Sequence, residues 1–536
     1  MPPLLRNISS WDYWLKNDPD RQFIMDGITH GFSIIDPHVD PSTVPHASTV
    51  NSRSATTIYN FHKVNDQISE ELAQGNYIIA PPQPRIISAI SAIPKPDGGI
   101  RLVHDLSRPE ECGVNYYATK DPCKYQTVDE ALQLIKPGWF MAVVDLKSAY
   151  RSVHIQHAQR TLTGLSWTFP GDKEPTIMYD SRLPFGSRKA PAIFNRLTQA
   201  VRRIMTNQGH KVVAYLDDFW VCGADFQSCK AALDELICLL RALGFQINWN
   251  KIKDPSQATS FLGILINTVS GELSLKPDKL EQLIGMVRSF LQKTRATRRQ
   301  LEQLAGKLSW AARVIPWGRA HLRSIFSLIA TLKQPSHKGR ITGIKWDLKW
   351  WATFLQNGEN RRKIWLPTDT LDVYTDASLK AGGAFCHGDW LYTQWAADCP
   401  ALKDHHINTK ELAAVVAAAC RWGHLWAGHH VIVHTDSSVT LGVINKGSAR
   451  NQTCLQLLQL LARLSMQHGF VISARHIPGD DNTLADTISR LHEPNNAAML
   501  CSMLQCLYTP YDLLCHMSER SWFSLFRMPC MGPLPT

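Results

Sequence analysis

Hydrophobic and polar positions predict several strands in the first half of the chain. Apolar alternation in residues 86–107 predicts two strands around the turn at 96–99, and the apolar run at 139–146 predicts a third. Residues 210–222 contain two apolar stretches separated by the polar pair Asp217-Asp218, which is typical of a hairpin. We expect these strands to form an antiparallel sheet.

Apolar residues at helical spacing predict the helices that accompany these strands. They occur at 128–135, at 190–205 and at 229–244, where Gly244 predicts the end of the last helix. This order of helices and strands is typical of an α+β unit. Residues 1–75 are polar and interrupted by prolines, with weak periodicity, so we expect an extension that packs on the main body.

The second half of the chain changes character twice. In residues 276–332, apolar positions recur at helical spacing with Lys and Arg between them, which predicts a basic helical bundle. A connector with three tryptophans follows at 344–355, and we interpret these side chains as packing between domains. Residues 371–492 then predict an α/β unit in the order strand, strand, helix, strand, helix, strand, helix.

Three aspartates stand out in the first half because apolar strands flank them. Asp145 ends the strand at 139–146, and Asp217 and Asp218 are adjacent in the hairpin. Carboxylates in such a setting are costly unless a cation neutralises them. Nucleotidyl transfer uses two divalent ions ~3.5–4 Å apart, and oxygen ligands suit Mg²⁺. The alternative is a surface Asp-Asp turn without function.

Four further acids are spaced along the second unit. Asp376 and Asp436 each follow a short apolar strand, while Glu411 and Asp486 lie near the starts of helices. Such positions can converge at one edge of a sheet, and four carboxylates there indicate bound cations. The alternative is a set of four unrelated surface acids.

Composition and charge narrow the class of protein. The chain has 57 Lys and Arg against 46 Asp and Glu, a net charge of +11 that weakly favours a polyanionic partner. None of the 13 cysteines forms a Cys-x-x-Cys pair, and the first residues do not resemble a secretory signal. No apolar run is long enough to span a membrane. We expect an intracellular protein, in the cytoplasm, the nucleus or both.

Six motifs make the first half resemble reverse transcriptases. They are, in chain order, KPDGGIRLVHDLS, VVDLKSAYRSV, LPFGSRKAPAIF, YLDD, GFQINWNK and SFLGI. The resemblance implies a right-hand polymerase of fingers, palm and thumb that copies RNA into DNA. It also implies RNA template, DNA primer and deoxynucleoside triphosphates as partners, with two Mg²⁺ ions, or Mn²⁺ in their place, at each active site.

The resemblance also implies roles for single residues. Asp145 and Asp217 would be the main metal ligands, with Asp218 beside them. Tyr150 would crowd a ribose 2′-hydroxyl, and Lys251, with Lys253 as a rival, would protonate pyrophosphate. The remaining nucleotide-binding residues would be Lys95, Arg101, Leu146 through its backbone carbonyl, Phe185 and Gly186.

The second half resembles ribonuclease H, and its four acids match the metal-binding set of that family. The resemblance implies cleavage of RNA in an RNA–DNA hybrid. His476 would be a mobile proton shuttle near the scissile phosphate, and Asn482 would support its loop.

These resemblances give a domain plan and an element type. The plan is an extension at 1–75, fingers and palm at 76–275, thumb at 276–345, connector at 346–370, ribonuclease H at 371–492 and a tail at 493–536. Phrases such as HHINTKEL and NTLADTISR are most similar to DIRS-type retrotransposons, with gypsy-like elements second. A separately encoded recombinase or capsid protein would then be a further partner. The rival hypothesis is a decayed element copy that only binds nucleic acid.

Overall fold

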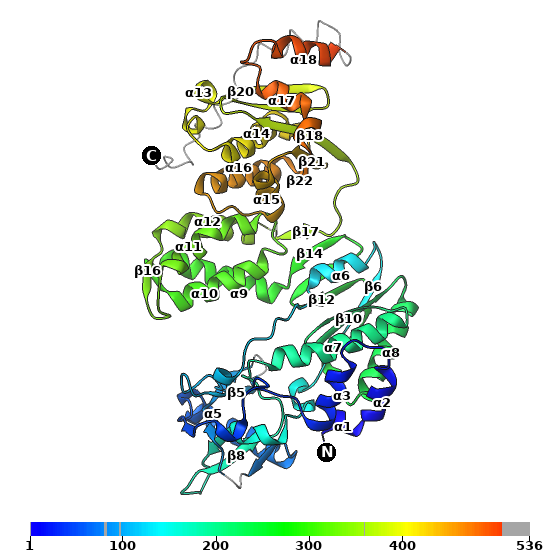
Figure 1. Cartoon of the computed structure of the whole chain (residues 1–536), viewed down its shortest axis with the longest axis vertical. Helices are drawn as coiled ribbons and strands as arrows, with labels where there is room; N and C mark the ends of the chain where they lie inside the picture. Colours follow the sequence, from blue (N-terminus) through cyan, green and yellow to red (C-terminus); the bar gives the residue numbers. More distant parts are fainter. Residues whose placement is uncertain (1, 80–82, 96–97, 358–359, 506–536) are drawn as a thin grey trace. The chain divides into compact units, whose positions relative to one another are not determined.

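The computed structural model describes residues 2–79, 83–95, 98–357 and 360–505. The chain divides into two compact units, residues 1–271 and 272–536 (Figure 1). Part of the predicted turn at 96–99 and most of the tail lie outside the described residues. Within the described ranges, no helix combines the length and apolar character needed to cross a bilayer.

The first unit is built on a central antiparallel sheet with the strand order β11-β6-β10-β9. The bounds of its strands are β6 Phe140–Asp145, β9 Lys211–Tyr215, β10 Asp218–Gly223 and β11 Lys253–Ser256. Helices α7 (Ala190–Asn207) and α8 (Phe226–Ala242) supply apolar residues to its core. The short helix α6 (Val128–Leu134) precedes β6, and Gly244, with a φ of 92°, follows α8 as expected.

The first unit also contains a hairpin and a five-stranded sheet outside the central sheet. The hairpin of β4 (Ile90–Pro94) and β5 (Ile100–His104) corresponds to the strands predicted at 86–107. A five-stranded sheet has the order β1-β3-β7-β8-β2. Its strands are β1 Ala47–Ser48, β2 Tyr77–Ile79, β3 Ile86–Ile87, β7 Gly164–Trp167 and β8 Thr176–Asp180. The hairpin β12 (Ala258–Phe261) and β13 (Ile264–Asn267) lies near the end of the unit.

The first 75 residues form helices that belong to the cores of this unit. Their bounds are α1 Pro3–Arg6, α2 Ile8–Trp14, α3 Arg21–His30, α4 Arg53–Thr56 and α5 Ile58–Ala73. Trp11 and Ile24 are fully buried in the same cluster as Phe194 of α7. The indole of Trp11 donates to the carbonyl of Leu243 over 2.9 Å. The segment therefore packs on the main body, and its helices are mostly too short to show a periodic pattern.

The second unit begins with helices and a basic two-stranded ribbon. The helices are α9 Pro277–Gln292, α10 Arg298–Ala311, α11 Arg323–Thr331 and α12 Lys345–Gln356. They match the predicted bundle and connector, but β15 (Arg295–Thr297) and β16 (Lys338–Arg340) form a ribbon that the periodicity did not predict. Strands β14 (Glu272–Leu275) and β17 (Arg361–Lys363) pair as well.

The rest of the second unit is a mixed five-stranded sheet with the order β20-β19-β18-β21-β22. Its strands are β18 Thr370–Ala377, β19 Ala381–Cys386, β20 Asp389–Gln394, β21 His430–Thr435 and β22 Val471–His476. The helices are α13 Trp395–Asp398, α14 Ile407–Trp422, α15 Ser438–Lys446, α16 Gln452–His468, α17 Thr483–Ser489 and α18 Asn496–Gln505. The predicted order was wrong in two respects: it lacked β20, and it counted α15 and α16 as one helix.

Helices cover both faces of this sheet. Ala384 and Cys386 of β19 pack in one core with α14, whereas Phe385 between them packs in another with Ile488 of α17. Because successive side chains of a strand point to opposite faces, α14 and α17 lie on opposite sides of the sheet. The ends of β18, β21, α14 and α17 carry the four acids of the sequence prediction.

Candidate active sites

Three aspartates lie together at one end of the central sheet of the first unit. Asp145 is the last residue of β6, and Asp218, the first of β10, is its partner in the antiparallel register. Asp217 occupies the turn before β10, where Leu216 has a φ of 49°. The amide of Leu146 donates to the carbonyl of Asp217 over 3.0 Å, which ties this turn to the end of β6.

Burial and neighbouring carboxylates oppose the ionisation of Asp217 and Asp218. Burial raises the pKa of Asp218 to about 7, and the charges of Asp217 and Asp145 add to the shift. Burial also raises the pKa of Asp217, to which the charge of Asp145 again contributes. Lys251 and Arg101 lower the pKa of Asp217. A cluster of this kind is stabilised by cations placed close to it.

Lys251 supplies such a charge from the segment that follows α8. Its ammonium nitrogen lies 3.1 Å from both carboxylate oxygens of Asp145. The rival Lys253 instead donates to the hydroxyl and carbonyl of Ser260. The side-chain amide of Asn248 donates to Asp145 Oδ1 over 2.9 Å, and its backbone amide donates to the Asp145 carbonyl. Sequence reasoning missed Asn248, because an asparagine in a loop is most simply a turn residue.

The predicted nucleotide-binding residues come from the hairpin and from the chain around β6. Lys95 follows β4 and Arg101 lies on β5, both exposed. Arg101 lies over the ring of Phe185, with 5.9 Å between its guanidinium carbon and the ring centroid. Tyr150 packs on the ring of Phe185 at a centroid distance of 4.9 Å. These contacts place two of the predicted residues, Arg101 and Tyr150, against the ring of a third, Phe185.

Gly186 is required by close packing rather than by flexibility. Its φ is 126°, and a Cβ at this position would lie 2.0 Å from the carbonyl oxygen of His104. Only glycine allows this approach. The neighbouring carbonyl of Phe185 accepts the amide of His104 over 2.9 Å. The loop is thereby fixed against β5, the strand that carries Arg101.

The second unit brings together three of its four predicted acids. Asp376 lies near the end of β18, Glu411 in the second turn of α14 and Asp436 directly after β21. Carboxylate oxygens of these three residues all lie within 4.8 Å of one another. Asp376 and Glu411 are buried, whereas Asp436 is exposed. Ser489 donates to Asp376 Oδ2 over 2.6 Å, and the amide of Ala377 donates to Glu411 Oε1 over 3.2 Å.

Burial and neighbouring carboxylates make Asp376 and Glu411 difficult to ionise. Burial raises the pKa of Glu411 to about 9, and the charges of Asp376 and Asp436 add to the effect. Burial also raises the pKa of Asp376 to about 6. Glu411 Oε2 is buried without a hydrogen-bond partner among the described residues. An unpartnered buried oxygen in an all-carboxylate donor set fits a divalent cation that prefers oxygen ligands.

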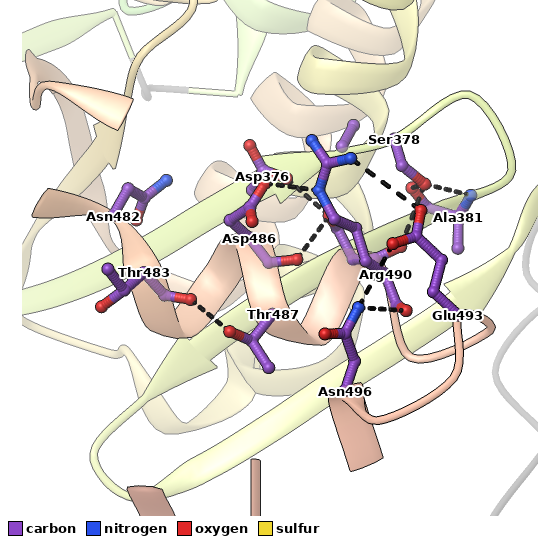
Figure 2. Close-up of polar contacts among 12 residues, drawn as sticks. Asp376, Ser378, Ala381, Asn482, Thr483, Asp486, Thr487, Arg490, Glu493 and Asn496 are labelled. Atoms are coloured by element: carbon purple, nitrogen blue, oxygen red, sulfur yellow. Dashed lines mark hydrogen bonds and ion pairs between the residues drawn. The ribbon is translucent and has the colours of Figure 1, made fainter. Parts of the chain in front are cut away.

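The fourth acid, Asp486, contacts Arg490 beside Asp376 (Figure 2). Its Oδ1 accepts from Nε of Arg490 over 2.7 Å, one helical turn further along the chain. Asp486 is not part of the group of three whose oxygens lie within 4.8 Å. The hydrogen bond to Asp486 raises the pKa of Arg490. Asp486 therefore lies beside the cluster with its charge already paired.

His476 and Asn482 flank the same edge of the sheet. His476 is the last residue of β22, is exposed, and is paired in register with Thr435, which directly precedes Asp436. Asn482 is buried, and its side-chain amide donates to the carbonyl of Thr375 over 3.0 Å. Asn482 therefore fixes the start of α17 to the strand that carries Asp376.

Residues 54–266 match the family model described as reverse transcriptase (RNA-dependent DNA polymerase). The Pol polyprotein of the transposon opus from Drosophila melanogaster is 27% identical over 229 residues, which are 42% of this chain and 21% of that protein. The enzymatic polyprotein of Cauliflower mosaic virus (strain D/H) is 23% identical over 382 residues, 68% of this chain and 52% of that protein. The chain thus spans about half or less of the length of these relatives.

Solved structures of a foamy viral protease-reverse transcriptase are similar in fold. The complex with double-stranded DNA has a TM-score of 0.50 at 16% identity and covers 88% of this chain and 97% of that one. The complex with an RNA/DNA hybrid has the same TM-score and identity and covers 88% and 63%. The likeness confirms the predicted fold class, a right-hand polymerase followed by a ribonuclease H-like α/β domain. This chain therefore contains a reverse transcriptase domain of the kind found in retroelement and retroviral polyproteins.

Proposed function

We propose that this chain is an RNA-directed DNA polymerase that also hydrolyses RNA in RNA–DNA hybrids, at two separate carboxylate sites. The observation that carries the proposal is the convergence of Asp376, Glu411 and Asp436 in a domain that follows a reverse transcriptase domain. The proposed partners are an RNA template, a DNA primer, the hybrid they produce and deoxynucleoside triphosphates.

At the first site, Asp145, Asp217 and Asp218 would hold Mg²⁺ or Mn²⁺. When bound, the ions supply Lewis-acid stabilisation to the transferring phosphoryl group. Lys95 and Arg101, which are both exposed, would bind the triphosphate, because cationic donors match phosphate oxygens. In this proposal the ring of Tyr150 crowds a ribose 2′-hydroxyl and Lys251 delivers a proton to the leaving pyrophosphate.

At the second site, Asp376, Glu411, Asp436 and Asp486 would hold the divalent ions. The unpartnered oxygen of Glu411 and the raised pKa of its carboxyl support this assignment, because both features call for a cation. His476, exposed at the end of β22, would carry a proton to or from the scissile phosphate.

Two crossed substitutions test the separation of the sites. We expect Asp217→Asn to lower Mg²⁺-dependent primer extension on an RNA template roughly 10³-fold and to leave hybrid cleavage unchanged. Asp376→Asn is expected to do the reverse. Matched controls are Asp254→Asn in β11, where the carboxylate is exposed, and Asp372→Asn, four residues before Asp376 on β18.

The outcomes separate the alternatives. Loss of both activities in either single variant contradicts two independent sites. Wild-type protein that binds a primed template but performs neither reaction is the decayed copy that only binds nucleic acid. The finer assignment to a DIRS-type element, with a gypsy-like element second, is supported by the sequence phrases. Reading frames beside the gene test it, because a DIRS-type element would encode a recombinase there. An intracellular location is proposed with it, and fluorescence microscopy of the tagged chain tests that.

A further inference from the structure

Lys410 is a buried lysine that the proposed chemistry does not use. Its side chain is among the largest fully buried ones, although lysine is almost never buried unless its charge is paired. It lies in the first turns of α14, where a positive charge opposes the helix dipole. No salt bridge of Lys410 with an acid is found among the described residues. Its position therefore calls for a specific reason.

The ammonium group of Lys410 connects two loops through their backbones. Nζ donates to the carbonyl of Leu379 over 2.6 Å and to the carbonyl of Lys403 over 2.7 Å. Leu379 belongs to the turn between β18 and β19, three residues after Asp376. Lys403 belongs to the loop that leads into α14. One buried charge therefore joins the end of the Asp376 strand to the beginning of the Glu411 helix.

Lys410 and its neighbour Glu411 together hold the segment 377–379. Glu411 accepts the amide of Ala377 over 3.2 Å, while Lys410 donates to the carbonyl of Leu379. The two contacts have opposite polarity and lie two residues apart on the same short segment. They fix how far α14 lies from the end of β18. That separation sets the distance between the carboxylates of Asp376 and Glu411.

We propose that Lys410 is a positioning residue that holds Asp376 and Glu411 at the spacing required to bind a divalent cation. The inference rests on the proposed hydrolytic site and extends it to a residue that does not touch the ion. Removing the ammonium leaves two backbone carbonyls without their donor and frees α14 to shift against β18. Residues that orient metal ligands in this way typically contribute 10–100-fold to metal affinity.

The test measures Mn²⁺ binding to the full chain by electron paramagnetic resonance. The relevant site is defined as the binding that Asp376→Asn removes. We expect Lys410→Met to weaken this binding roughly tenfold. Hybrid cleavage is expected to require proportionally more Mg²⁺ and to recover most of its maximal rate at saturating Mg²⁺. Primer extension is expected to stay unchanged. Lys410→Arg, which keeps cationic donors, is expected to retain more affinity than Lys410→Met.

Lys403→Met is the matched control. It removes a lysine side chain from the loop before α14 but leaves in place the backbone carbonyl that Lys410 contacts. The Lys403 side chain is 58% exposed, so Mn²⁺ binding is expected to be unaffected. Lys410→Met protein with normal primer extension and wild-type Mn²⁺ affinity overturns the role of Lys410. If that variant does not fold, Lys410→Gln decides by the same comparison. Wild-type protein without binding that depends on Asp376 overturns the proposed hydrolytic site itself.

Discussion

The two carboxylate clusters of this chain solve the same electrostatic problem in different ways. In the first unit, Lys251 lies 3.1 Å from both oxygens of Asp145, so a residue of the chain already compensates part of the negative charge. In the second unit, no salt bridge to the three converging acids is found among the described residues, although the charge of Arg490 lowers the pKa of Asp376. Glu411 Oε2 also has no hydrogen-bond partner in this part of the chain.

The difference predicts how each cluster behaves without metal. Where a lysine lies on the carboxylate, a metal ion must compete with that lysine for the ligand. Where no lysine is present, protons take the place of the metal, as the pKa of about 9 for Glu411 indicates. Both clusters are therefore expected to respond to pH, the first near pH 7 through Asp218 and the second near pH 9 through Glu411, but only the first is expected to respond to the loss of a lysine.

The largest expected effect is that of Glu411→Gln. Neutralising this proposed ligand is expected to lower hybrid cleavage roughly 10³-fold, since several kcal/mol of charge stabilisation are lost. The metal-free protein is expected to melt at a higher temperature at pH 8, because folding of the variant no longer requires the uptake of a proton that the unfolded wild-type chain has released at this pH. Cleavage assays and thermal melts in a chelator measure the two effects. A drop in melting temperature would show that the carboxylate stabilises the fold instead of straining it.

Lys251→Met tests the other cluster and is expected to have the second largest effect. Lys251 is the proposed proton donor, and loss of such a donor typically costs 10²–10⁴-fold, so primer extension is expected to fall about 10²-fold at saturating Mg²⁺. The Mg²⁺ concentration for half-maximal rate is expected to decrease, because the competing ammonium is gone. Lys253→Met is the matched comparison, because the ammonium of Lys253 contacts Ser260. An unchanged or increased Mg²⁺ requirement contradicts competition between lysine and metal.

The pH dependence of stability has a definite sign. The ordinary pKa of Glu411 is 4.5 and its folded value is about 9, so the folded chain holds a proton that the unfolded chain releases between these values. Stability without metal is therefore expected to fall as pH rises through this window. Mg²⁺ is expected to flatten the slope by stabilising the ionised cluster. Melting temperatures from about pH 5 to 9 measure this, and an equal slope in Glu411→Gln protein would assign it to other groups.

Arg490→Gln is expected to have the smallest effect. The side chains of Arg490 and Asp486 are 45% and 42% exposed, and exposed ion pairs contribute little to stability. We expect a melting temperature within about a degree of wild type and a change of only a few-fold in the Mg²⁺ requirement of hybrid cleavage, as Asp486 is released from its partner. A loss as large as that of Glu411→Gln would instead place Arg490 on the substrate.

The sequence predicted long periodic elements better than short ones. The helix expected at 190–205 is observed at Ala190–Asn207, and the strand expected at 139–146 is observed at Phe140–Asp145. By contrast, α15 and α16 were merged although Gly447, with a φ of 61°, ends the first and Asn451 caps the second. Five residues, 447–451, separate the two helices, and apolar residues continue on both sides.

The sequence also indicated some residues of the candidate sites better than others. Asp376, Glu411 and Asp436 could be recognised because each is an acid at the end of an apolar strand or the start of a helix. Asn248 and Lys410 could not be recognised, since their roles depend on contacts with Asp145, Leu379 and Lys403 that only the folded chain creates. A sequence pattern indicates acids that converge in the fold more readily than the residues that contact the same segments through their backbones.

The burial of Trp11 beneath Leu243 has a practical consequence for anyone who shortens this protein. The family match begins at residue 54, yet the indole that seals the end of α8 comes from residue 11. A fragment that begins at residue 54 would expose to water the apolar core residues that Trp11 covers. Such a truncated protein is expected to aggregate when it is expressed. A fragment that begins at the start of α1 keeps Trp11 and is expected to stay folded.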